Sequence, residues 1–393
     1  ISLRRIFDLR KTINKLFLII TVISALLLTT GCDLFIKTNK GQVDPKWYMG
    51  LTYEDDNGND TDYTIGTDGT IAAVALEDGY GDEFGIIKGE EAYLNINTII
   101  KNIDKRFYVD ATNNLVMFTD ATKTYKTKIG GKTINETENT DYVISFMDGK
   151  NCYVNVKFVK KYVDFDYKVV KAEGKSPARI VLKYTSGEKN QMTVKSNIEM
   201  RTKADYQNLI VTTLKKNTKV TVLEESGDWT KVGTDDGFMG YVPAKKLKDK
   251  ETKKTEFKSD ADTYTHVLMN KKISLGWNAI TNLTANGNLE TIIEHTKGLN
   301  VISPTWYSLS DNKGNLRSYA SATYVEKAHS KGLKVWALVN DFGTQDKASK
   351  EYTKKVLTDT TKRENLVDNI MTNIKDYNLD GICLLYTSDA ADE

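Results

Sequence analysis

Three patterns of hydrophobic and polar positions follow one another along the chain. Residues 86–184 alternate between apolar and polar side chains, as in 142–146 and 153–159, which predicts β-strands with one or two short helices. Residues 192–248 contain short apolar runs separated by turn residues, which predicts a small all-β domain. From Thr263 onward, strand-like runs alternate with helical periods, and this alternation predicts βα units around a parallel sheet.

The βα pattern also predicts where individual elements lie. It indicates strands at 273–277, 299–306, 334–340 and 379–382, and helices at 288–296, at 322–331 and from a capping box at 361–364. Four strands in about 120 residues are half of what an eightfold barrel of roughly 250 residues requires. We therefore expect residues 263–382 to form the first half of a (β/α)8 TIM barrel.

Two stretches lack a regular apolar period. Residues 32–85 are rich in Asp, Asn, Gly and Thr, which predicts a linker or a short β segment. The acidic run 53–62 offers oxygen ligands for calcium but lacks the glycine and distal glutamate of a calcium loop, so a solvated turn is the favoured interpretation. Residues 249–262 are mainly charged, which predicts a linker before the βα segment.

The first 31 residues have the pattern of a secretion signal. A basic start precedes an uncharged run, and Thr29, Thr30 and Gly31 then lead to Cys32. The run of about 16 residues is shorter than the roughly 20 needed to cross a bilayer, but it suits the apolar core of a signal peptide. Small residues before a cysteine resemble the lipobox of bacterial lipoproteins, which implies lipidation of Cys32 and a membrane anchor at the cell envelope. An ordinary cleaved signal and an anchor helix are the alternatives.

Composition and charge narrow the functional classes. With 393 residues, 40% hydrophobic content and only 4 prolines, the chain is long enough for several folded domains and is neither disordered nor collagen-like. Its 55 basic residues nearly balance its 53 acidic ones, so charge gives no reason to expect nucleic-acid binding. Histidines and cysteines show no metal-ligand spacing, and we expect neither a metal nor another cofactor.

Two of the predicted domains resemble known modules. Residues 192–248 contain Val-Thr-Val-Leu at 220–223, Gly-Asp-Trp-Thr-Lys-Val at 227–232 and Gly-Phe-Met-Gly-Tyr-Val at 237–242. This pattern resembles the bacterial SH3-like barrel, and the resemblance implies binding of a cell-wall peptide. Residues 86–184 resemble the small α+β module first named from the N-terminus of copper amine oxidases, which implies a structural spacer without copper chemistry.

The βα segment carries a more specific resemblance. Its motifs are Ile-Ser-Leu-Gly-Trp at 273–277, Gly-Leu-Asn-Val-Ile-Ser-Pro-Thr-Trp-Tyr at 298–307, Gly-Leu-Lys-Val-Trp-Ala-Leu-Val at 332–339 and Tyr-Asn-Leu-Asp-Gly-Ile at 377–382. Together they resemble the first half of a glycoside hydrolase family 18 barrel. The resemblance implies an exported enzyme that hydrolyses β-linked N-acetylglucosamine-containing polymers, such as peptidoglycan or chitin.

The family's signature at the end of the fourth strand is incomplete in this sequence. It reads Asp-x-x-Asp-x-Asp-x-Glu, and Asp380 fits its first position as a candidate catalytic residue. The remaining acids would fall at Cys383, Leu385 and Thr387. In this family, as the resemblance implies, the glutamate protonates the glycosidic oxygen and the substrate's own acetamide attacks the anomeric carbon. Threonine cannot act as a general acid near neutral pH, so we expect the sequence as printed to be inactive.

Two explanations for the missing acids remain open. The chain can be a natural pseudo-enzyme that binds glycan without cutting it. The favoured explanation is that residues 383–393 are a non-native tail, because they back-translate to a sequence that resembles a sequencing-library adapter. The native chain would then continue to a glutamate at 387.

Aromatic residues near strand ends are the candidate substrate-binding groups. Barrel active sites lie at the carboxyl ends of the strands, where Trp277, Trp306 and Tyr307 could stack on sugar rings and Asp341 could hydrogen-bond to substrate. Trp336 is mid-strand and is expected in the core. The predicted function is that of a family 18 glycoside hydrolase on a membrane-anchored lipoprotein. The alternative is a non-catalytic lipoprotein that binds cell-wall glycan or peptide.

Overall fold

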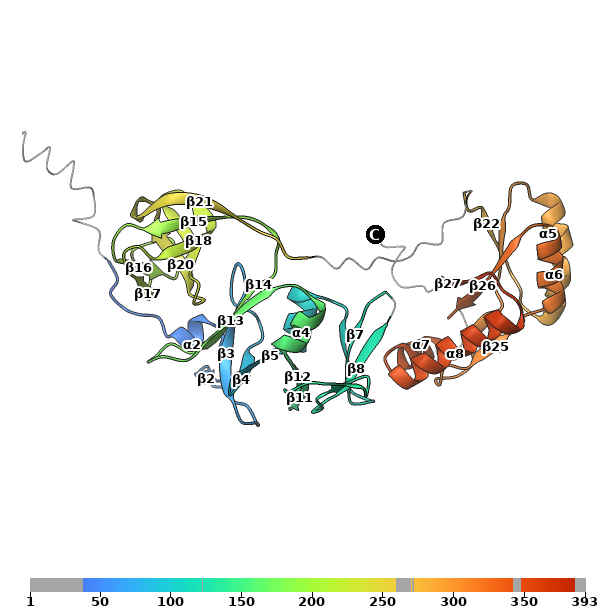
Figure 1. Ribbon diagram of the computed structural model, residues 1–393, viewed down its shortest axis with the longest axis horizontal. Helices are drawn as coiled ribbons and strands as arrows, with labels where there is room; N and C mark the ends of the chain where they lie inside the picture. Colours follow the sequence, from blue (N-terminus) through green and yellow to red (C-terminus); the bar gives the residue numbers. More distant parts are fainter. Residues whose placement is uncertain (1–37, 122, 259–269, 271, 342–347, 386–393) are drawn as a thin grey trace, which may run out of the picture. The chain divides into compact units, whose positions relative to one another are not determined.

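A computed structural model describes residues 38–121, 123–258, 270, 272–341 and 348–385. The predicted secretion signal, Cys32 and Thr387 lie outside the described residues. Among those described, no helix combines the length and the apolar character needed to cross a membrane. The described chain is a mixed α/β protein with many sheets (Figure 1), and it divides into two compact units, Ile1–Lys105 with Ser145–Asp260 and Arg106–Ile144 with Ala261–Glu393.

The first unit contains a sheet built around an internal repeat, which we call the repeat sheet. Its strands run in the order β11 (Ser145–Asp148), β12 (Asn151–Asn155), β5 (Glu91–Asn95), β4 (Gly85–Lys88), β3 (Thr70–Ala75), β14 (Ala178–Lys183) and β13 (Asp166–Val170). The hairpin β4–β5 leads into the helical turns α3 (Ile96–Thr98) and η2 (Ile99–Ile103), and β11–β12 leads into α4 (Val156–Tyr162) in the same way. Antiparallel pairing of β5 with β12 at the centre relates the two copies by a local two-fold axis.

The two copies turn from strand to helix by the same device. Asn95 and Asn155 are buried at corresponding positions, and their side-chain oxygens accept hydrogen bonds from the N–H groups of Asn97 (2.9 Å) and Lys157 (2.8 Å). Each asparagine therefore caps the helix that follows it.

The predicted all-β domain forms a second sheet in the same unit, with strand order β17 (Ile210–Leu214), β16 (Ile198–Arg201), β20 (Met239–Pro243), β19 (Trp229–Gly233), β18 (Lys219–Ser226), β15 (Gly187–Val194) and β21 (Leu247–Thr255). The linker prediction is wrong for residues 249–255, because they form most of β21 and pair with β15. An exposed ladder of backbone hydrogen bonds needs no apolar side chains, so the hydrophobic pattern did not reveal this strand.

Residues 38–51 also belong to this domain rather than to a free linker. Gln42 bridges Ile210 as an added parallel strand position. The helix α2 (Pro45–Tyr48) follows, and Val43, Met49 and Leu51 join the same buried core as Val232 and Val242. Farther on, β1 (Thr52–Glu54) and β2 (Asp60–Asp62) form a short antiparallel ribbon around the acidic run.

The turn between β19 and β20 joins the all-β domain to the repeat sheet. The Nε of Arg179 donates to the carbonyl oxygen of Asp236 (2.5 Å), and Tyr80 Oη donates to that of Gly237 (2.9 Å). A Cβ on Gly237 would come within 2.9 Å of Val181, and its φ of 85° favours glycine. We call these contacts the turn clamp.

The second unit contains the predicted parallel sheet. Its parallel strands β22 (Leu275–Asn278), β23 (Val301–Pro304), β26 (Lys334–Asn340) and β27 (Gly381–Leu385) lie side by side in chain order. The connecting elements are η4 (Leu283–Asn288), α5 (Leu289–His295), the hairpin β24 (Tyr307–Leu309) with β25 (Leu316–Ser318), α6 (Ala322–Ser330), α7 (Ala348–Leu357) and α8 (Thr360–Asp376).

The predicted strands and helices of this segment are confirmed, with shifted ends. Helix α8 begins at Thr360 rather than at the expected capping box, because the carboxylate of Asp359 accepts the N–H of Lys362 (3.2 Å) and is the N-cap. Strand β27 extends to Leu385, so it includes residues 383–385 of the predicted tail.

The predicted spacer module 86–184 does not group as one body. Its middle strands β6 (Phe107–Asp110), β7 (Leu115–Thr119), β8 (Thr124–Lys128), β9 (Thr133–Ile134) and β10 (Glu138–Asn139) belong to the second unit. Buried Asp110 accepts the N–H of Thr360 (2.5 Å) at the start of α8. Burial alone would raise the pKa of Asp110, but hydrogen bonds from Thr360 and Asn113 outweigh it and lower the pKa to about 2.

Candidate functional site

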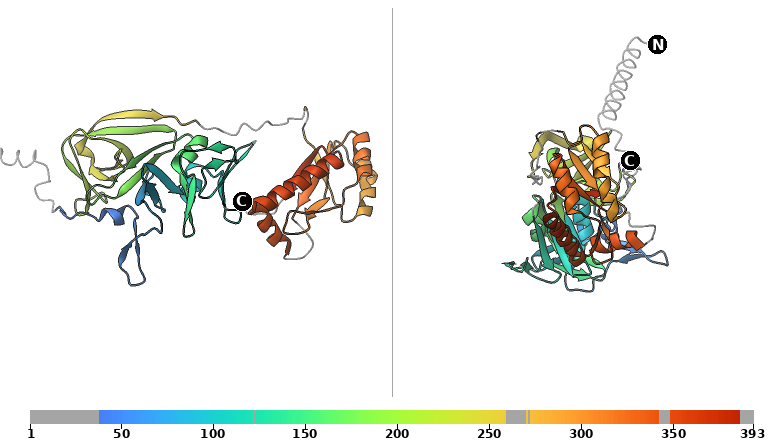
Figure 2. Two further views of the ribbon diagram at one scale, coloured as in Figure 1. Left: turned by 60° about the horizontal axis from the view of Figure 1, so that its bottom comes forward. Right: turned by 90° about the vertical axis from the view of Figure 1, so that its right-hand side faces the viewer.

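One face of the parallel sheet packs against helices and the other carries tryptophans. Ile302, Val335, Ala337 and Val339 form a core with side chains from α5, α6 and α8 (Figure 2, orange and red helices). Because successive side chains of a strand point to opposite faces, Trp336 and Leu338 lie on the other face. We call this the aromatic face.

Trp277 belongs to the aromatic face as well. Asn278 donates a hydrogen bond through Nδ2 to Tyr324 Oη on α6 (2.9 Å), which places Asn278 on the helix-packed side. Trp277, one residue earlier, therefore points the opposite way. Its side chain is 62% exposed, and its ring is open to a ligand.

A glycine on β27 determines how Trp336 lies. Trp336 is paired in register with Gly381, and a Cβ at Gly381 would come within 2.9 Å of the indole Cδ1 and 3.1 Å of Nε1. The half-buried indole therefore lies directly over the backbone of β27. Trp336 was expected in the core, and it is half-buried on the same face as Trp277, beside Leu338, which is 2% exposed.

The other predicted aromatic contacts lie in the core. Trp306 and Tyr307 are each 1% exposed and belong to the helix-packed cluster. Trp306 donates from Nε1 to Asn286 Oδ1 (2.8 Å) and packs edge-on against Tyr324 at 5.1 Å between ring centroids. Neither ring presents a face to a ligand in this structure. Burial raises the pKa of Tyr307 well above its usual range.

Asp341 and Asp380 lie at opposite ends of the sheet. Asp341 follows Asn340, the last residue of β26, and is partly exposed at the carboxyl edge. Asp380 precedes β27 at the amino edge, where its carboxylate contacts Lys334 Nζ (2.7 Å), His329 Nε2 (2.8 Å) and the N–H of Val335 (2.9 Å). The predicted site residues therefore do not gather at one place.

The contacts of Asp380 keep it ionised. Its burial works to raise the pKa, but hydrogen bonds from Lys334, the backbone of Val335 and His329 outweigh that effect and lower the pKa. The carboxylate thus ties the amino ends of β26 and β27 to the C-terminus of α6. In the middle of β27, Cys383 pairs in register with Leu338, so this position offers a thiol rather than a carboxylate.

The all-β domain contains a buried arginine that the sequence did not single out. Arg201 is 1% exposed, and its Nη1 donates to the carbonyl oxygens of Asn39 (3.0 Å), Tyr206 (2.9 Å) and Asn208 (2.7 Å), while Nη2 contacts Glu199. Tyr206 in turn packs edge-on against Trp229 at 4.8 Å. Arg201 holds the loop beside these aromatic rings, and no motif described in the sequence analysis included it.

A metal centre finds no support in the described part of the chain, where no group of three or more His, Cys, Asp or Glu side chains could hold an ion.

The comparisons with known proteins cover parts of the chain. No curated protein matches it. Among solved structures, the C-terminal domain of a putative chitinase from Desulfitobacterium hafniense DCB-2 matches with 22% identity and a TM-score of 0.26, over 30% of this chain and 35% of that one. A chitinase from Chromobacterium violaceum ATCC 12472 matches with 12% identity and a TM-score of 0.24, over 28% of this chain and 34% of that one.

The chain thus spans about a third of the length of these two solved structures. The family model of the bacterial SH3 domain matches residues 196–248. This match confirms the resemblance predicted for 192–248 and identifies that part of the chain as a bacterial SH3 domain.

Proposed function

We propose that the parallel-sheet segment is a family 18 glycoside hydrolase barrel in its first half, and that it binds β-linked N-acetylglucosamine-containing glycan on its aromatic face. The observation that carries the proposal is the pairing of two features on one sheet. The strands β22, β23, β26 and β27 follow chain order with helices on one face, and two tryptophans, Trp277 and Trp336, occupy the other.

Strand order supports a barrel over the other common parallel architecture. A doubly wound sheet reverses its strand order partway and carries helices on both faces. In a barrel, each βα unit is added beside the previous one and the helices remain outside. The order β22–β23–β26–β27 fits the second scheme.

The aromatic face supports a sugar ligand. Pyranose rings present flat arrays of C–H bonds that pack on aromatic rings, and binding sites for small ligands combine aromatic walls with a few polar groups. Trp277 supplies an exposed ring, and Asp341 at the carboxyl edge supplies a hydrogen-bond acceptor.

Glycan binding without hydrolysis is the activity we expect from the printed sequence. Asp380 is a positioning residue in this proposal, because its carboxylate is held at the amino edge, away from the carboxyl end where barrel chemistry takes place. Cys383 stands where the family has an acid. The hydrolase function then requires the glutamate that the family has at position 387, where this sequence has Thr387.

A binding experiment tests the proposal. Trp277→Ala should weaken the binding of an N-acetylglucosamine hexamer at least about tenfold, because it removes the exposed stacking ring. Trp47→Ala is the matched control, since Trp47 is 53% exposed but lies in the first unit. Equal affinity of the parent chain and Trp277→Ala, or no binding by either, would refute the proposal.

Two measurements together distinguish the two candidate functions, a hydrolase and a binding lipoprotein. They are the gene sequence at codon 387 and a turnover assay. Resequencing the gene across codon 387 should yield glutamate if the enzyme is correct, and that protein should release reducing ends from the hexamer. Threonine at 387 with binding but no turnover would support the binding lipoprotein. For either function, export and a lipid anchor at Cys32 are proposals that rest on the signal pattern alone.

A further inference from the structure

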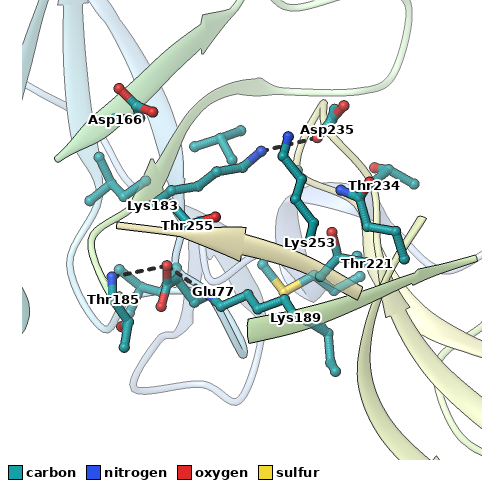
Figure 3. A pocket seen from close by; sticks show the side chains of 18 of the residues that line it. Glu77, Asp166, Lys183, Thr185, Lys189, Thr221, Thr234, Asp235, Lys253 and Thr255 are labelled. Carbon is teal, nitrogen blue, oxygen red and sulfur yellow. Dashed lines mark hydrogen bonds and ion pairs between the residues drawn. The ribbon is translucent and has the colours of Figure 1, made fainter. Parts of the chain in front are cut away.

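Charged side chains around a cavity of about 350 Å³ in the first unit balance one another. Lys183 pairs with Asp235 (3.1 Å) and Lys189 pairs with Glu77 (2.8 Å) in its wall (Figure 3). The described lining holds equal numbers of lysines and carboxylates. This balance gives no reason to expect a charged ligand in that cavity.

An arginine of the second unit is not balanced in this way. Arg317 is an exposed residue of β25, and its Nη2 donates to Ser308 Oγ on β24 (2.9 Å). Its guanidinium also lies 5.7 Å from the ring centroid of Tyr319. Both contacts are uncharged, and no ion pair of Arg317 occurs in the part of the chain that the structure describes. Because Ser308 is only 6% exposed, a buried hydroxyl orients the guanidinium and leaves its charge uncompensated.

Strand register places Arg317 on the aromatic face. Arg317 pairs with Ser308, and Ser308 pairs with Asn340 of β26. Directly paired residues of adjacent strands lie on the same face of a sheet, and Asn340 has the same parity as Trp336. Leu316, the neighbour of Arg317, packs against the helix-covered core, as the alternation requires. Arg317 and the tryptophans therefore belong to one face.

Arg317 also belongs to a cross-strand row at the carboxyl edge of the sheet. The row runs from Arg317 through Ser308 and Asn340 to Leu385, the last residue of β27. Adjacent strands are about 4.8 Å apart, so about 14 Å separates the two ends of the row. Position 385 is one at which the family 18 signature has an acid, as the resemblance implies. The guanidinium thus lies at the edge where barrels bind their substrates, but away from the reacting position.

We propose that Arg317 selects glycans that carry a carboxylate, such as the lactyl carboxylate of N-acetylmuramic acid in peptidoglycan. The guanidinium binds this carboxylate through paired N–H···O hydrogen bonds, on a sugar that lies at the carboxyl edge of the aromatic face. The inference rests on the proposed glycan binding and decides between the two polymers that it left open. An uncharged chitin chain offers Arg317 no anion.

Three hexasaccharide probes test the selection on the full chain. The acidic probe alternates N-acetylglucosamine with N-acetylmuramic acid and carries no peptide, the second probe is the same glycan with its carboxylates converted to methylamides, and the third is the N-acetylglucosamine hexamer. The acidic probe should bind at least about tenfold more tightly than either neutral one, because it alone forms the charge-assisted pair. Added salt should reduce this preference.

The outcomes distinguish this inference from the proposed glycan binding. Equal affinities for the acid and its methylamide would overturn the role of Arg317, while binding of the N-acetylglucosamine hexamer would still support glycan binding on the aromatic face. Absence of binding by all three probes would refute the glycan binding and this inference with it.

Variants of the β24–β25 hairpin locate the charge. Arg317→Gln should abolish the preference for the acid over its methylamide, and Arg317→Lys should retain part of it, because an ammonium group keeps the charge but not the planar pair of donors. Lys313→Gln is the matched control and should keep the full preference. Lys313 is an exposed cation in the turn of the same hairpin, where its carbonyl oxygen accepts a hydrogen bond from Asn365 of α8 (2.9 Å).

Thermal melts establish that each variant folds. A full preference for the acid in Arg317→Gln, or an equal loss of preference in Lys313→Gln, would contradict the assignment.

Discussion

At the scale of single residues, buried charges hold the loops of this protein in place. Arg201 donates to backbone carbonyl oxygens in two segments, at Asn39 and in the loop that contains Tyr206 and Asn208. The sequence motifs of this domain do not indicate that the guanidinium of Arg201 is buried. Because one partner, Asn39, lies 162 positions away, local pattern could not assign the full role of this residue.

Replacement of Arg201 by lysine should destabilise the SH3 domain by about 2–3 kcal/mol. An ammonium group cannot reproduce the planar set of donors, so some of the buried carbonyl oxygens lose their hydrogen bonds. Denaturant unfolding of Arg201→Lys measures the effect. Lys203→Ala, an exposed neighbour, is the control and should change the free energy of unfolding by less than about 0.5 kcal/mol.

Asp380 should make the stability of the second unit depend on pH. Its pKa is lowered by folding, so the carboxylate stabilises the native state above its unfolded pKa of about 3.9, and this stabilisation is lost as the pH falls through the folded value. The difference in free energy of unfolding between the parent and Asp380→Asn should therefore be largest near neutral pH and shrink below pH of about 4. A difference that does not change with pH would show that the charge is not responsible.

At the scale of elements, strand parity separates the aromatic residues that the sequence grouped together. The pattern correctly predicted the parallel strands, and 334–340 matches β26 at both ends. Proximity to a strand end did not predict exposure, because Trp306 and Tyr307 lie where β23 gives way to β24 and both pack into the helix-covered core. Trp336 could have been assigned to the aromatic face from its alternation with Val335 and Ala337.

Gly381→Ala should displace the indole of Trp336 from β27. The added methyl would come within 2.9 Å of the ring, closer than normal contact, and overpacking of this kind costs about 1–3 kcal/mol. We expect a change in tryptophan near-ultraviolet circular dichroism together with a lower melting temperature. Gly287→Ala is the control, because nothing lies within 4 Å of a Cβ there. An unchanged spectrum in Gly381→Ala would contradict the described ring position.

At the scale of the whole chain, local pattern predicted domains better than it predicted their grouping. The SH3 domain was recognised almost in full, because its turns and strand cores are close in sequence. The division of residues 86–184 between two units was not predicted, since it depends on distant contacts such as that of Asp110 with Thr360. Strand β21 was missed because backbone pairing and exposed lysines leave no hydrophobic period.

The turn clamp should make the repeat sheet and the SH3 domain unfold together. Gly237→Ala would force its Cβ against Val181 and Ala75 at a φ of 85°, which should loosen the clamp. Calorimetry should resolve one transition for these parts of the parent chain and two in the variant. Gly227→Ala is a suitable control, because its φ of 58° is also positive but its Cβ meets nothing within 4 Å. Two transitions in that control would attribute the effect to backbone strain instead.

The turn clamp also limits how freely the SH3 domain can reorient in solution. Many binding modules are joined to the rest of their protein by flexible linkers. The linker length then sets the effective concentration for a second binding event. Here Tyr80 and Arg179 hold the β19–β20 turn by hydrogen bonds to its backbone, so rotational diffusion of the SH3 domain is coupled to that of the repeat sheet. Nuclear spin relaxation should therefore give both a common rotational correlation time, and ligands reach the SH3 surface at a fixed orientation.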